Sequence, residues 1–167
     1  MCSRTASWVV TLVVLTLSPV AIGDAYADVS CEPLRRLLVL ADTQFKRLRG
    51  YFDPRLQSWV ATYRMPGASL CTIQDTENAT YYSCEWVHDP SASSVSENYA
   101  GLVRLVTRCL DVRGSNQHEP TPDSQVIRFG IADSRKTVVV GKSESSADGY
   151  FVTLDIVPIG LKDFPAE

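Results

Sequence analysis

Apolar side chains recur at helical spacing in two segments of the chain, residues 32–49 and 96–110. A proline stands in the first turn of the earlier segment and a glycine directly follows it, as is usual at helix ends. Ser94 and Glu97 stand at capping-box spacing at the start of the later segment. The pattern therefore predicts two amphipathic helices, whose apolar positions are Leu34, Leu37, Leu38, Ala41, Phe45 and Leu48, then Tyr99, Leu102, Val103, Val106 and Leu110.

Alternating apolar and polar residues predict a hairpin and a three-stranded antiparallel meander. In the hairpin, residues 70–74 and 81–87 flank a polar turn. If Cys71 faces Cys84, then Ile73, Tyr82 and Trp86 share their apolar face, and a slip of one residue destroys this agreement. Tyr81 then falls on the wetter face. The strands expected in the meander are residues 125–132, 137–142 and 150–158.

Residues 54–64 fit two secondary structures. Asp53-Pro54 is a helix-start signal, and a helix of about three turns is the interpretation that we adopt, although residues 58–64 also fit a strand. Residues 111–124 are polar and predict a loop. The resulting fold class is α+β, with an antiparallel sheet of about five strands and two or three helices packed on one of its faces.

The first 27 of the 167 residues have the pattern of a secretory signal peptide. An apolar run of ten residues is too short for an uncleaved span of about 20 residues, and Ala25-Tyr26-Ala27 is a small-x-small cleavage pattern. Residues 28–167 are then expected to form a single exported domain, periplasmic or secreted, without a transmembrane segment.

Four cysteines follow the predicted cleavage point, an even set of the kind that forms disulfides in an oxidising compartment. Strand alternation favours pairing Cys71 with Cys84. Cys31 and Cys109 then remain, at ends of the two predicted helices that antiparallel packing brings together. The two other pairings of four cysteines stay open at this point.

The net charge of −3 and the predicted export argue against a nucleic-acid partner. Basic residues nevertheless gather on the first helix and its exit, and Tyr81 is the one aromatic residue near the hairpin that parity places on the wetter face. These residues form a candidate interaction surface for an acidic protein or an envelope surface. Its members are Arg35, Arg36, Lys46, Arg47 and Tyr81. We therefore expect an exported, non-enzymatic domain that binds another protein or a surface.

Two other functions have weaker support. His88-Asp89 and His118-Glu119 could serve a small exported hydrolase as a general base, but no metal-ligand spacing, nucleophile motif or phosphate loop accompanies them. We therefore expect no metal and no cofactor. A small-ligand carrier is the second alternative, with a cavity lined by Tyr63, Trp86 and Phe129. Asn78 lies in a glycosylation sequon, which matters only in a eukaryotic secretory pathway.

Overall fold

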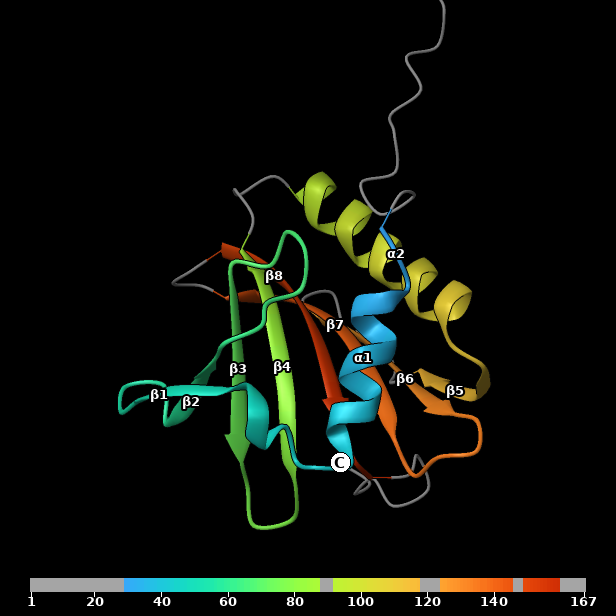
Figure 1. Ribbon diagram of the computed structural model, residues 1–167. Helices are drawn as coiled ribbons and strands as arrows, with labels where there is room; N and C mark the ends of the chain where they lie inside the picture. Colours follow the sequence, from blue (N-terminus) through green and yellow to red (C-terminus); the bar gives the residue numbers. More distant parts are fainter. Residues whose placement is uncertain (1–28, 88–91, 118–123, 146–148, 160–167) are drawn as a thin grey trace, which may run out of the picture.

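The computed structural model describes residues 29–87, 92–117, 124–145 and 149–159, and shows one antiparallel sheet with two α-helices (Figure 1). The sheet has eight strands in the order β1-β2-β3-β4-β8-β7-β6-β5. The α+β class and the antiparallel sheet are confirmed, whereas the expected number of about five strands is too low. The elements are α1 (Glu32–Ala41), a 3-10 helix η1 (Lys46–Leu48), β1 (Arg49–Asp53), β2 (Ser58–Ala61), β3 (Leu70–Asp75), β4 (Thr80–Val87), α2 (Ala92–Cys109), β5 (Val112–Gln117), β6 (Ser124–Ile131), β7 (Thr137–Ser145) and β8 (Gly149–Val157).

The core lies between one face of the sheet and the two helices. Alternate positions of the central strands β4, β8 and β7 are fully buried there, together with the apolar stripes of α1 and α2. Helix α2 packs against β7 and β8, and α1 packs against β8. We call this side of the sheet the helix face and the other side the open face. The central core residues are Tyr82, Cys84, Trp86, Val138, Val140, Val152, Leu154, Ile156, Leu34, Leu37, Leu102 and Leu105.

The predicted hairpin is confirmed in both its strands and its register. Cys71 of β3 lies opposite Cys84 of β4, and Ile73 lies opposite Tyr82. These four side chains are at most 3 % exposed, as expected for the apolar face of the hairpin. The strands of the meander, β6, β7 and β8, also agree with the prediction to within a few residues.

The first helix is shorter than the sequence predicted, because it ends at Ala41 rather than at Arg49. Gln44 and Phe45 both have positive φ, 52° and 53°, which no α-helix can contain. The reversal places the Phe45 ring in the core, 5.7 Å from the Tyr82 ring, and leaves no exposed surface on it. Burial of this large aromatic side chain therefore outweighs the local preference for continuing the helix.

The prediction of a helix over residues 54–64 is wrong, and the alternative of a strand is the one observed. Residues 54–57 form a turn in which Asp53 accepts a hydrogen bond from the Arg55 N–H at 2.8 Å. Strand β2 then pairs with β1 on one side and with β3 on the other, with Trp59 opposite Ile73. Pairing on both sides holds the backbone of β2 within the sheet, whereas an isolated helix of about three turns is only marginally stable.

The loop predicted over residues 111–124 contains an additional edge strand, β5, which pairs with β6. This strand has a single apolar residue, Val112, at its start. Alternation of apolar and polar residues could not reveal it, because one apolar residue among six gives no period-two pattern.

The two cysteine pairs in the structure are the two that the sequence favoured. Cys31 lies at the start of α1 and Cys109 at the end of α2, with their Cα atoms 5.1 Å apart. Cys71 and Cys84 join the hairpin strands, with a Cα–Cα distance of 4.1 Å. Both pairs are at disulfide distance, which is compatible with an oxidising, exported compartment. None of the helices in the described ranges is both long and apolar enough to cross a membrane.

Candidate interaction surface

The β1–β2 hairpin carries an unusual amount of exposed apolar surface. Tyr51 is 68 % exposed, Phe52 is 46 % exposed and Leu56, in the turn, is 45 % exposed. Of the four large exposed apolar side chains among the described residues, three therefore belong to this hairpin. Figure 1 shows the hairpin projecting from one side of the sheet, away from α2. We call these three residues, together with Arg49 and Trp59, the hairpin surface.

Strand β1 is an edge strand, because it pairs with β2 on one side and is the first strand in the sheet order. Its outer backbone groups face no other strand in the described part of the chain. An edge of this kind is a template on which an extended segment of another protein can add as a further strand.

The opposite edge of the same sheet provides a comparison. Strand β5 is also terminal in the sheet and also carries a register irregularity, but its sequence is polar after Val112, and Ser115 is exposed. Polar edges of this kind discourage association, whereas aromatic side chains on an edge favour it. The two edges of the sheet therefore differ in chemistry.

Two arginines lie against aromatic rings on the helix face beside the hairpin. The Phe52 and Trp59 rings pack edge to face with centroids 5.3 Å apart. The Arg49 guanidinium lies 5.6 Å from the Trp59 ring centroid, and that of Arg36, on α1, lies 5.5 Å from the Tyr63 ring centroid. These stacked arginines keep positive charge next to apolar surface, an arrangement typical of protein-binding sites.

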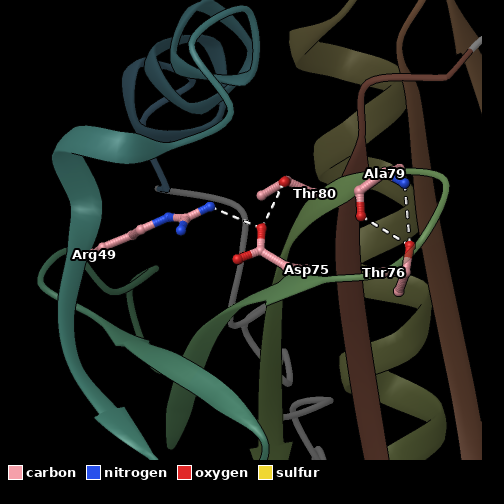
Figure 2. Close-up of polar contacts among 5 residues, drawn as sticks. All are labelled: Arg49, Asp75, Thr76, Ala79 and Thr80. Atoms are coloured by element: carbon pink, nitrogen blue, oxygen red, sulfur yellow. Dashed lines mark hydrogen bonds and ion pairs between the residues drawn. The ribbon is translucent and has the colours of Figure 1, made fainter.

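A small polar network fixes Arg49 in this position (Figure 2). The Arg49 Nη2 donates to Asp75 Oδ1 at 2.7 Å, and the same oxygen accepts a hydrogen bond from the Thr80 hydroxyl at 2.6 Å. The Thr76 hydroxyl donates to the Ala79 carbonyl at 2.8 Å and closes the turn between β3 and β4. The network ties the guanidinium to the end of the disulfide-linked hairpin.

The basic residues predicted as an interaction surface divide between two roles. Arg36, Lys46 and Arg47 are exposed on α1 and η1, in the segment that leads directly into β1. Arg35 is also exposed, but its Nε donates to the Cys109 carbonyl at 3.2 Å, so it links α1 to the end of α2.

The segment that contains the hairpin surface is strongly basic. Residues 33–64 contain seven basic and two acidic residues, a net charge of +5 in a chain whose total is −3.

Tyr81 does not join this group, because it lies on the open face, opposite to its buried neighbour Tyr82. Its hydroxyl donates to Gln74 Oε1 at 2.6 Å. Burial and the nearby charge of Asp155 both raise the pKa of Tyr81. Burial also raises the pKa of Asp155, to about 6, and a hydrogen bond from Ser83 counteracts part of that increase.

Of the residues of the two alternative functions, the structure describes those of the small-ligand carrier and not the histidines of the hydrolase. His88 and His118 lie outside the described residues, as does the predicted signal peptide. Trp86 and Phe129 are core side chains, 2 % and 3 % exposed, on strands that β8 and β7 separate. No group of three or more His, Cys, Asp or Glu side chains in the described ranges is arranged to hold a metal ion.

Sequence reasoning did not identify Tyr51, Phe52 or Leu56 as candidate residues. The predicted helices placed Tyr51 and Phe52 in a short linker and Leu56 on a buried helix face. The available signal was the strand-like pattern of residues 58–64, which makes residues 49–53 a second strand across a turn that begins at Asp53-Pro54.

Comparison with known proteins found no relative of this chain. No family model matches it, and neither does a curated protein or a solved structure.

Proposed function

We propose that this protein is an exported, non-enzymatic binding domain, and that its β1 edge binds an extended, acidic segment of a partner protein. The observation that carries the proposal is the exposure of Tyr51 and Phe52 on an edge strand, in contrast to the polar strand β5 at the opposite edge of the same sheet. The partner segment adds to β1 as a ninth strand, and its backbone pairs with the outer groups of that strand.

The charge of the surrounding segment selects the partner. Arg36, Lys46 and Arg47 flank the hairpin surface, and the segment from residue 33 to residue 64 has a net charge of +5. Acidic side chains on the incoming segment complement this charge, while apolar side chains pack against Phe52 and Trp59. Because these cations are exposed, they contribute mainly to the rate of association and to its dependence on salt.

Site-specific photo-crosslinking in the source organism tests the proposal. A photoreactive phenylalanine at position 51 should give one discrete crosslinked protein, whereas the same residue at position 115, exposed on the other edge strand, should give none. The Arg47→Glu substitution should reduce the crosslinked product at least five-fold. A product of equal yield from both positions, or none from position 51, would contradict the proposal.

A further inference from the structure

The two disulfides lie in different surroundings. Cys71 and Cys84, which join the hairpin strands, are both buried in the core. Cys31 is only partly buried at the start of α1, although its partner Cys109 at the end of α2 is buried. Thiol–disulfide exchange requires direct attack of a thiolate on an accessible sulfur. The bridge between the helices therefore offers a route of attack in the folded protein that the hairpin bridge lacks.

The position of Cys31 also favours its release as a thiolate. Cys31 is the N-cap residue of α1, a helix of ten residues. The positive end of a helix dipole stabilises a negative charge at this position, and cysteines at helix N-termini are accordingly more reactive than free cysteine. The other half of the bridge, Cys109, lies at a helix C-terminus, where the dipole gives no such help.

Arg35 brings a positive charge to both halves of this bridge. Cys31 and Arg35 are four residues apart and so lie on the same side of α1. The Arg35 Nε donates to the Cys109 carbonyl at 3.2 Å, which holds the guanidinium beside the end of α2. A guanidinium in this place attracts an approaching thiolate and stabilises the thiolate that leaves.

A second arginine adds to this charge. Arg108 directly precedes Cys109, and its Nη2 donates to the carbonyl of Val29 at 2.9 Å, two residues before Cys31. Glu32 is the acidic residue of the first turn of α1, but it is exposed, so water and salt screen its charge. The surroundings of the bridge are therefore predominantly positive.

The hairpin disulfide has an apolar environment instead. Cys71 shares its face of β3 with Ile73, and Cys84 lies opposite Leu154 of β8, all within the core. A thiolate formed there would be desolvated, which disfavours its charge. This pair is thus an internal control for the pair that joins the helices.

We infer that the Cys31–Cys109 disulfide is a thiol-exchange site, which a dithiol reductant opens in the folded protein while the hairpin disulfide stays closed. One thiolate of the reductant attacks the Cys31 Sγ. The S–S bond breaks, and its electron pair goes to the Cys109 Sγ, which then takes up a proton. The second thiolate of the reductant attacks the mixed disulfide and expels Cys31. The reductant becomes a disulfide, and the protein gains two electrons and, once both sulfurs are protonated, two protons.

Opening of this bridge releases the start of α1 from the end of α2. A dithiol of the kind carried by thiol–disulfide oxidoreductases is the reductant that fits this chemistry, because its second thiol resolves the mixed disulfide. The inference is independent of the proposed function, since it concerns the helices and not the β1 edge.

Limited reduction of the folded protein with dithiothreitol, followed by alkylation and peptide mass spectrometry, tests this inference. The initial rate of alkylation at Cys31 and Cys109 should exceed that at Cys71 and Cys84 at least ten-fold. Initial rates are compared because opening of one bridge can destabilise the molecule and expose the other. Equal initial rates, faster opening of the hairpin bridge, or no opening without denaturant would overturn the inference.

Substitution of Arg35 tests the role of charge. Arg35→Gln should slow the opening of the Cys31–Cys109 bridge at least three-fold, whereas Arg35→Lys, which keeps the charge, should retain most of the rate. Arg55→Gln removes an exposed cation from the β1–β2 turn and should leave the rate unchanged. A loss of stability would accelerate opening, so slower opening in Arg35→Gln cannot result from unfolding. Unchanged or faster opening in Arg35→Gln would overturn the inference.

Discussion

Asp155 shows what alternation along a strand can and cannot predict. It lies between Leu154 and Ile156, both fully buried on the helix face, so the pattern of residues 150–158 correctly places it on the open face. The pattern does not show that Asp155 is only partly exposed there, across from Ser83 and close to Tyr81. Burial depends on neighbouring strands that are distant in sequence, and it raises the pKa of this carboxyl to about 6.

The raised pKa of Asp155 predicts a pH dependence of stability. The folded state binds the proton more tightly than the unfolded state, whose pKa is about 3.8, so this carboxyl contributes stability that is lost as pH rises through about 6. Replacing this carboxyl with a neutral amide should therefore stabilise the protein more at pH 8 than at pH 5. The difference in the free energy of unfolding between Asp155→Asn and the wild type should be about 1 kcal/mol larger at pH 8. Urea unfolding of both proteins at the two pH values measures this difference, and an equal gain at both would show that the carboxyl titrates normally.

The elements show where apolar periodicity predicts burial but not backbone conformation. The stripe predicted for the first helix is largely buried, including Phe45 and Leu48, although the helix ends at Ala41. The same side chains reach the core through a left-handed turn and a 3-10 helix, so spacing alone could not distinguish the two backbones. The β1–β2 hairpin was missed for a related reason, because a proline that can begin a helix can also begin a turn.

Gly50 makes the β1–β2 pairing possible, since a Cβ atom at this position would lie 2.6 Å from the Val60 carbonyl oxygen. The Gly50→Ala substitution should loosen the hairpin, accelerate hydrogen exchange in β1 and β2, and lower the free energy of unfolding by about 1–2 kcal/mol. Gly149→Ala is a matched control: its φ of +78° strains an alanine, but nothing lies within 4 Å of the added Cβ. The control should leave exchange in β1 and β2 unchanged, and a similar acceleration in both variants would contradict this role of Gly50.

The whole molecule repeats one arrangement twice, although the sequence shows no repeat. Helix α1 precedes β1–β4, helix α2 precedes β5–β8, and the last strands of the two halves pair at the centre of the sheet. In that central pair, Cys84 lies opposite Leu154. The sequence predicted the second half of the sheet better than the first, because β6 and β8 alternate regularly whereas β1 and β2 are short and none of the five residues of β1 is buried.

The two cysteine pairs should stabilise the molecule unequally, because they close loops of different length. Cys31 and Cys109 are 78 residues apart and connect the two helices, whereas Cys71 and Cys84 are 13 apart within one hairpin. In the loop-entropy model the long closure contributes about 4.5 kcal/mol and the short one about 3 kcal/mol. Replacing each pair with alanines and measuring urea unfolding should give this order, and a larger loss for the hairpin pair would contradict it.

The central claim is that β1 accepts an extended segment of a partner protein. Hydrogen exchange of the protein with and without the partner captured by crosslinking measures this most directly, because a strand added to β1 protects its outward amides. We predict slower exchange across residues 49–53 in the complex, with exchange in β5, at the other edge, unchanged. Protection of β5 or of the exposed side of α1, with none in β1, would contradict the claim.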